Sequence, residues 1–342
     1  MSWSSRQLET LIQRVEVLRL FATSKLWYNA SALPLPAKFA KKFESSMVKF
    51  LWVGRLEKLK IDEVKNPYLS GGLNLPCVIS KADSLLLCQV CRMLKNSASK
   101  EYKHMKYWLG LYISEYFPDM SVGPHAEIIS PYFQHIKALL VGGLLLGDVK
   151  SEALERVTAK ELYEGFTTTF PPPKIIFKYD VQWEQVWIRL QNPVLDPLAR
   201  DILFTIIHNI VPNKERVHRF RMIASPNCST CGVIADNVHI FCECENVREA
   251  WFWLRQRLLG LMDQTAGNIS NFEFLNLMFD TSPFESEILW LLGVHVQLVW
   301  NSVICKKKFL TQSFMKSEVQ QSFYDHHAAR KPSLGHISGL FQ

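Results

Sequence analysis

The sequence predicts a mainly α-helical protein in two parts, and three observations lead to that fold class. Apolar side chains recur every three or four residues over long stretches, which is the spacing of one helix face. Three adjacent prolines, Pro171 to Pro173, interrupt the chain near its middle. Cysteines and a histidine gather between residues 228 and 244, at spacings that suit a small helical module built around a metal ion.

Amphipathic helices are expected throughout the N-terminal part. The first is predicted from Gln7 to about Asn29, the second over residues 38–51 and the third from about residue 77 to residue 94. The lysines of the second helix lie mostly off its apolar side, where a solvated face is the ordinary explanation: Lys38, Lys41, Lys42 and Lys49. The third helix contains Cys88 and Cys91, a C-x2-C pair whose apolar helical context favours packing over metal binding.

The three prolines mark the clearest boundary in the chain. Adjacent prolines favour an extended segment that no helix crosses, so a domain boundary or hinge is expected near residues 167–176. The sequence therefore predicts a helical region over residues 1–170 and a helical metal-binding domain over residues 171–310. Residues 311–342 are expected to form a C-terminal helix and a tail that is mobile from Asp325 onward. Within the first region, Thr158 and Glu161 form a capping box that predicts a short helix.

Composition limits the function classes. With 342 residues, 48% of them hydrophobic and 21% charged, the chain has the balance of an ordinary globular protein. Eight cysteines are too sparse for a disulfide scaffold and the first residues have no apolar signal core, so an intracellular location is expected, nuclear or cytoplasmic. The apolar stretch Ile288 to Ile304 is interrupted by polar residues, and a buried helix is expected there instead of a membrane span. The net charge of +7 permits a nucleic-acid partner.

The segment with the most chemical information has the pattern C-x2-C-x7-H-x4-C. Its four residues are Cys228, Cys231, His239 and Cys244. Three thiolates and one imidazole satisfy a tetrahedral zinc ion, and a site that uses all four ligands is structural, because a catalytic zinc keeps one position for water. Cys242 is an alternative fourth ligand. A second alternative is a set of ordinary buried cysteines around a core histidine.

Neighbouring residues are suited to hold these ligands in place. Gly232 supplies the backbone freedom of a tight turn that aims the first two thiols inward. Asp236 or Asn237 can cap a helical turn that carries the histidine, and Asn246 can cap the helix that follows the last cysteine. The sequence thus predicts local structure for both halves of the site.

Basic residues flank the same segment. Lys214, Arg216, Arg219 and Arg221 lie within two helical turns before the first ligand, and Arg248 follows the last one. A metal site beside a basic helix makes a rigid cationic surface, which suits contacts with phosphates. The alternative is a solvated helix face without a partner.

The order of these features resembles a known family. The run from Leu203 to Phe220, then the four ligands, then Val247 to Trp251 is similar to the zinc-binding region that follows the polymerase in non-LTR (LINE-type) retrotransposon reverse transcriptases. Three N-terminal segments resemble the thumb and connecting region of the same enzymes: residues 33–36 (LPLP), 50–54 (FLWVG) and 70–76 (SGGLNLP). The likeness covers roughly residues 1–310.

The resemblance implies a module that helps to hold the element RNA and the target DNA during target-primed reverse transcription. The four ligands would then bind one structural zinc ion, and the five basic residues would contact phosphates. Polymerisation needs carboxylates for two metal ions, and the family's adjacent aspartate pair does not occur in this sequence. The sequence also lacks G-x-S-x-G, G-x-x-x-x-G-K and H-E-x-x-H, so no catalysis is expected of the chain alone.

A different function class is the main alternative. A domesticated or relic scaffold, stabilised by zinc, would bind another protein and no nucleic acid. Its apolar contacts would depend little on salt, whereas phosphate contacts weaken steeply as salt rises. Neither reading includes a membrane or a small-molecule substrate.

Overall fold

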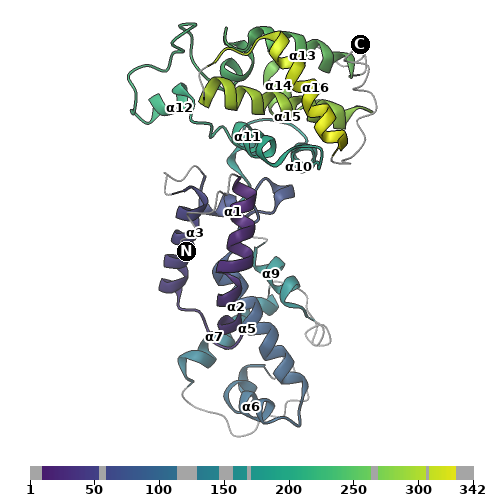
Figure 1. Cartoon of the computed structure of the whole chain (residues 1–342). Helices are drawn as coiled ribbons and strands as arrows, with labels where there is room; N and C mark the ends of the chain where they lie inside the picture. The colour runs from purple at the N-terminus through teal and green to yellow at the C-terminus, as the bar shows by residue number, and fades with distance from the viewer. Residues whose placement is uncertain are drawn as a thin grey trace. The chain divides into compact units, whose positions relative to one another are not determined.

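The structure is a computed structural model that describes residues 10–53, 59–113, 129–145, 157–167, 171–262, 269–305 and 308–328. Throughout these residues the chain is built from helices and has no strand, only one isolated antiparallel bridge between Asn227 and Ile234 (Figure 1). The predicted mainly α-helical fold class is therefore confirmed.

The chain divides into two compact units, which are described separately. The first comprises Gln13–Asn66 and Leu73–Pro171, and the second comprises Leu8–Ile12, Pro67–Gly72 and Pro172–Gln342, in each case for the residues described. The main change of unit falls inside the run of three prolines. Pro173 has φ −55° and ψ 140°, the extended conformation that adjacent prolines favour.

The first unit is gathered around α5 (Val78–Lys95). This helix packs against α2, α3, α6, α7 and α9, and it buries apolar side chains along its length, as the spacing of residues 77–94 predicts. Its cysteines, Cys88 and Cys91, are both buried, and they belong to no metal-ligand group among the residues described. The other helices of the unit are α1 (Leu11–Val17, whose first two residues belong to the second unit), α2 (Ser24–Ala30), α3 (Ala37–Leu51), α4 (Ile61–Lys65), α6 (Lys100–Ile113), α7 (Pro131–Leu145) and α9 (Ala159–Thr167).

The helix expected over residues 7–29 is divided into two. After α1 the chain makes a π-helical turn, Leu18–Ala22, and α2 begins only at Ser24. The Thr23 N–H donates to the Leu18 carbonyl at 2.9 Å, a bond across five residues, and its hydroxyl donates to the Arg19 carbonyl at 3.0 Å. A single π-turn keeps the chain helical between α1 and α2. The apolar side chains of residues 7–29 therefore still follow a roughly helical spacing, and the sequence does not reveal the break.

The short helix α9 begins where its capping box predicts. The Glu161 N–H donates to the Thr158 hydroxyl at 3.2 Å, and the Thr158 N–H donates back to the Glu161 carboxylate at 2.8 Å. The Tyr163 hydroxyl on the same helix accepts a hydrogen bond from the Cys77 N–H at 3.1 Å. This bond ties α9 to the start of α5.

The second unit has α15 (Glu285–Leu298) at its centre. Every side chain from Glu287 to Val296 is buried, and the helix packs against α11, α13 and α16. The stretch Glu285–Cys305 is long and apolar enough to span a membrane by length and composition, and 56% of its apolar window is buried inside the fold. The other helices are α10 (Trp183–Leu190), α11 (Pro197–Ile207), α12 (Lys214–Arg219), α13 (Arg248–Gly260), α14 (Asn271–Leu275) and α16 (Gln312–Ala328).

The C-terminal helix extends further than expected. α16 continues through Asp325 to Ala328, whereas mobility was predicted from Asp325 onward. The reason is packing: His326 is buried, and its ring lies 6.3 Å from that of Trp290, centroid to centroid. The predicted mobile tail after residue 328 lies outside the described residues.

Two buried polar side chains fix the elements of the second unit. Arg189 in α10 pairs with Glu285 at 2.9 Å and donates to two carbonyls of the loop after α14. His295 in α15 hydrogen-bonds the Phe241 carbonyl at 2.6 Å. Burial lowers the pKa of His295 to about 4, so this ring is neutral at physiological pH. Phe241 lies in the middle of the segment that carries the histidine and the last cysteine of the motif, and the bond anchors that segment to the core.

Candidate metal centre

The first half of the candidate site is a tight turn between Cys228 and Cys231. The Cys228 N–H donates to the Val233 carbonyl at 2.7 Å, and the Gly232 N–H donates to the Cys228 carbonyl at 3.0 Å. Gly232 has φ +73°, a left-handed conformation that a residue without Cβ adopts at low cost. The structure confirms the turn role predicted for this glycine, and the nearby bridge between Asn227 and Ile234 closes the loop.

The second half is a π-helical turn, η5 (His239–Glu243), which begins at a side-chain cap. Asp236 Oδ1 accepts a hydrogen bond from the His239 N–H at 2.7 Å, so Asp236 and not Asn237 provides the predicted cap. The Cys244 N–H donates to the His239 carbonyl at 2.7 Å. That bond spans five residues, which is the π-helical spacing, and it brings His239 and Cys244 to the same side of the turn.

The π-turn also decides between the two candidate fourth ligands. In an α-helix, residues three apart share a face, so Cys242 would have lain beside His239. In the structure Cys242 is buried and lies outside the ligand group, whereas Cys244 is part of it. The four residues brought together are Cys228, Cys231, His239 and Cys244.

The prediction for Asn246 is wrong. Helix α13 begins at Arg248, its N-cap residue is Val247, and no side chain caps it. The Cys244 carbonyl accepts from the N–H groups of both Val247 and Arg248 at 2.8 Å, so a backbone turn leads directly into the helix. The Asn246 side-chain oxygen is instead buried and has no hydrogen-bond partner among the described residues.

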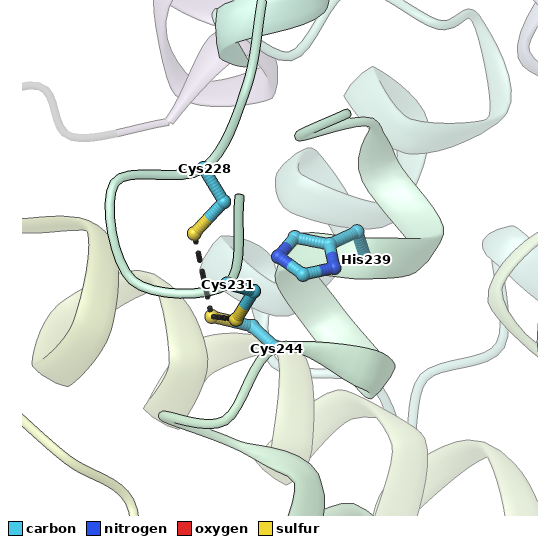
Figure 2. A group of neighbouring side chains, drawn as sticks. All are labelled: Cys228, Cys231, His239 and Cys244. Atoms are coloured by element: carbon cyan, nitrogen blue, oxygen red, sulfur yellow. Dashed lines mark hydrogen bonds between the residues drawn. The ribbon is translucent and has the colours of Figure 1, made fainter. Parts of the chain in front are cut away.

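The four ligand atoms form a compact group. They all lie within 4.8 Å of one another, with the Cys244 Sγ 3.9 Å from that of Cys228 and 3.7 Å from that of Cys231. A tetrahedral ion with metal–sulfur bonds of about 2.3 Å requires sulfur atoms about 3.8 Å apart. Figure 2 shows the imidazole of His239 facing the three thiols. The spacing therefore fits a metal ion bound by all four residues.

A buried nitrogen supports the same conclusion. His239 Nε2 is inaccessible to solvent and makes no hydrogen bond of ordinary geometry with any described residue, although the imidazole lies close enough to Cys228 to favour its thiolate. A buried polar atom without a partner is costly, and most such atoms in native proteins have one. A metal ion at the centre of the group would satisfy this nitrogen and the sulfurs together.

The ionisation of the thiols differs within the group. Burial raises the pKa of Cys228, but hydrogen bonds from the Cys231 backbone N–H, the His239 side chain and the Thr230 backbone N–H outweigh it and bring the pKa down to about 6. Burial raises the pKa of Cys244 to about 12, with a further contribution from the neighbouring thiols. Several thiolates this close repel one another unless a cation lies between them. A metal ion would displace the remaining protons.

The basic helix α12 is tied to the metal-binding turn. Asn213 Oδ1 caps α12 by accepting from the Arg216 N–H at 2.7 Å, and Asn213 Nδ2 donates to Asn237 Oδ1 at 2.6 Å. Asn237 begins the helical turn that carries His239. Sequence reasoning missed this tie, although an asparagine before Lys214 is a recognisable helix cap.

The five predicted phosphate contacts fall into two groups. Three are already engaged: Lys214 donates to the Asn227 carbonyl at 3.1 Å, Arg216 donates to the Asn209 carbonyl at 2.7 Å, and Arg219 pairs with Glu215 at 2.6 Å. The other two are exposed and have no side-chain hydrogen bond or ion pair with any described residue: Arg221 and Arg248. These two arginines are available to a ligand without breaking a contact.

A cavity of about 650 Å³ lies beside the start of α13. Arg248, Phe252 and Arg255 line it, together with Phe272 from α14. Arg255 donates to the Ile269 carbonyl at 2.7 Å, while Phe252 is 65% exposed. The sequence predicted Arg248 as a phosphate contact but did not indicate this cavity, because a cavity between two helices has no local signature.

No known protein family matches this sequence, and a search of characterised proteins finds no significant match either.

Proposed function

We propose that the second unit is a zinc-stabilised module that binds nucleic acid, related to the zinc-binding region of non-LTR retrotransposon reverse transcriptases. The observation that carries the proposal is the Cys3His group, whose ligand atoms converge within 4.8 Å around a buried imidazole nitrogen. The proposed partners are RNA and DNA, which the module would contact through their phosphates. The first unit would correspond to the thumb and connecting region of the same enzymes.

Zinc is the metal that this donor set favours. Three thiolates and one imidazole are soft and borderline ligands, and sulfur atoms 3.7 and 3.9 Å apart suit tetrahedral coordination. All four positions are filled by protein, so no place remains for a water or a substrate. The ion would therefore hold the turn Cys228–Cys231 against η5 and take no part in a reaction.

The nucleic-acid surface is proposed from the charges next to this metal group. Arg221 follows α12, and Arg248 begins α13 four residues after Cys244. Both side chains are exposed, while their backbones are held by hydrogen bonds: the Arg221 N–H donates to the His218 carbonyl and the Arg248 N–H to the Cys244 carbonyl. Rigidly placed arginines bind phosphates well because little conformational freedom is lost on contact.

The proposal includes no catalytic step. Polymerisation requires the paired carboxylates of a two-metal site, and the sequence has no adjacent aspartates. The chain would contribute binding to a reaction that other components carry out.

The test combines metal content with nucleic-acid binding over a salt series. The purified chain is expected to hold one zinc ion and to bind RNA and DNA with an affinity that falls linearly with salt on logarithmic axes. Replacing Arg221 and Arg248 with alanine should reduce that slope by about 1.8 on duplex DNA and about 1.4 on a single strand, since each phosphate contact contributes about 0.9 or 0.7.

A matched control keeps the same change in net charge. Arg257 and Lys316 both lie over the Trp253 ring, at 6.0 and 5.8 Å, and neither adjoins the metal group in sequence. Their double alanine variant should retain the full salt slope. Equal losses in both double variants would mean that only net charge matters, and the assignment of Arg221 and Arg248 would be wrong.

A protein-binding scaffold is the second candidate. Val233 and Ile234, on the loop that carries the first two cysteines, are 53% and 55% exposed. Apolar side chains at that exposure favour a protein partner. Zinc content of one per chain, with no salt-dependent binding to RNA or DNA, would support this candidate and reject the nucleic-acid one.

A further inference from the structure

The corner that follows α12 has an unusual backbone. The Arg221 N–H donates to the His218 carbonyl at 2.7 Å, and the Met222 N–H donates to the Val217 carbonyl at 3.2 Å. These two bonds close the helix as a Schellman-type C-cap, and Arg221 occupies its left-handed position with φ 58°. Glycine is the usual residue there, because a Cβ makes the left-handed conformation costly.

Nothing in the fold explains an arginine at this position. The Arg221 side chain is exposed and makes no hydrogen bond or ion pair with the part of the chain that the structure describes. A strained backbone position with a large, unused side chain points to a role outside the fold.

The residues on either side of Arg221 expose apolar surface. Phe220 is 60% exposed and Met222 is 66% exposed. The Arg216 guanidinium lies 5.4 Å from the centroid of the Phe220 ring, and it is itself held by a 2.7 Å hydrogen bond to the Asn209 carbonyl. The aromatic ring is therefore supported by an anchored cation and still open to solvent.

Resting on the proposed function, we propose that the corner Phe220–Met222 is a stacking platform for an unpaired base, so that the module prefers single-stranded nucleic acid. Phe220 would stack on the base, Met222 would cover its edge, and Arg221 would contact the adjacent phosphate. Aromatic side chains bind single strands in this way because every base has a π-face, whereas in a duplex those faces are already stacked on each other.

The charge of the corner selects this ligand over an apolar protein surface. From Lys214 to Arg221 the chain carries four cationic side chains and one carboxylate, that of Glu215. The carboxylate is paired with Arg219 at 2.6 Å, so it does not neutralise Arg221. A nucleotide is both aromatic and anionic, so it would match both the exposed apolar surface and the positive charge of the corner.

The experiment compares variants of the full, zinc-loaded chain on a short mixed-sequence single-stranded RNA, the matching single-stranded DNA and the corresponding duplex DNA. Phe220→Ala should weaken single-strand binding about tenfold at constant salt and leave duplex binding nearly unchanged. Phe220→Trp should retain single-strand binding. The matched control is Phe177→Ala, which removes a ring that is 77% exposed and should leave both affinities at the wild-type value.

Arg221→Gly gives a second readout, because this substitution should lower single-strand affinity without lowering the stability of the protein. Glycine fits φ 58° without strain, so the melting temperature should stay the same or rise while single-strand affinity falls. A clear drop in melting temperature would show that the arginine is needed for the fold, and the ligand role would be wrong.

The outcomes separate this inference from the proposed function. Salt-dependent binding of the wild type that is unaffected by Phe220→Ala, or reduced equally on single strands and duplex, overturns the stacking platform alone. Absence of binding to all three nucleic acids overturns the proposed function as well.

Discussion

The protein contains two C-x2-C pairs that fold in opposite ways. Cys88 and Cys91 lie on the helix α5, both buried, and burial together with the nearby Cys88 thiol raises the pKa of Cys91 to about 11. Cys228 and Cys231 lie on a turn that Gly232 closes, and in spite of burial, backbone N–H groups lower the pKa of Cys228 to about 6. The same spacing gives buried core thiols in one unit and half of a candidate metal-ligand group in the other.

The difference shows what a cysteine pair needs besides spacing. On α5, burial and the nearby Cys88 thiol keep the pKa of Cys91 raised and outweigh a backbone hydrogen bond that favours its thiolate. The turn at Cys228 directs N–H groups toward sulfur, and a second pair, His239 and Cys244, completes a group of four side chains that could hold a metal ion. A metal site therefore depends on backbone conformation and on a second ligand pair.

The largest expected effect comes from breaking the metal-binding pair. Cys231→Ser should remove the ion and unfold the second unit, because binding a structural zinc contributes about 10–16 kcal/mol, comparable to the whole stability of about 5–15 kcal/mol that a typical domain has. The first unit should keep its helical signal. Limited proteolysis and thermal melts, with and without a chelator, measure this; unchanged protease resistance in both cases would contradict the metal claim.

A pH series tests the core of the second unit apart from the metal. Burial lowers the pKa of His208 to about 4, outweighing its hydrogen bond to the Gly71 carbonyl. The unfolded state, with a pKa near 6.5, takes up the proton first, so the contribution of His208 to stability is complete above pH 6.5 and falls by about 3 kcal/mol as the pH drops to 4. His295 adds a loss of similar size.

Urea unfolding at several pH values, with bound metal monitored, measures this loss for the wild type and for His208→Gln. The variant should lack that part of the pH dependence, although its stability at neutral pH is lower. An identical pH dependence in both proteins would show that the proton is taken up elsewhere.

A cysteine-to-serine substitution on α5 should have a smaller effect than the same substitution at Cys231. Cys91→Ser places a hydroxyl among apolar side chains at a position that is 3% exposed, which should cost about 1–3 kcal/mol. The zinc content should stay at the wild-type value. Loss of metal in this variant would mean that the two pairs are not as different as the structure indicates.

The smallest effect is expected at the turn itself. Gly232→Ala puts a Cβ into open space, but at φ +73° it strains the backbone by about 1 kcal/mol. The melting temperature of the second unit should fall by about 2–4 °C with the metal retained. Gly260→Ala is the control, because Gly260 also has open space for a Cβ and lies in the helix α13. An equal or higher melting temperature in Gly232→Ala would contradict the role of the glycine.

Much of the metal centre could be predicted because its determinants are local. The ligand spacing, the glycine of the turn and the Asp236 cap all act within a few residues of one another. The same holds for the helix α5 and for the capping box at Thr158, since apolar periodicity and caps are properties of a short stretch.

The features that sequence reasoning missed depend on backbone conformation and on tertiary contacts. The π-helical segments Leu18–Ala22, η5 and Val299–Cys305 have no signature of their own in the apolar spacing of so short a stretch. For this reason the choice between Cys242 and Cys244 stayed open in the sequence. The tie between Asn213 and Asn237 and the left-handed Arg221 depend on tertiary contacts and on a backbone angle, and neither has a sequence signature of its own.

Metal stoichiometry of four cysteine variants tests the difference between the two pairs most directly. Zinc would be measured per chain in Cys88→Ser, Cys91→Ser, Cys242→Ser and Cys244→Ser after purification under reducing conditions. We expect one ion in the first three and none in Cys244→Ser. Full zinc content in Cys244→Ser, or loss of zinc in any of the other three, would contradict a closed site made of Cys228, Cys231, His239 and Cys244.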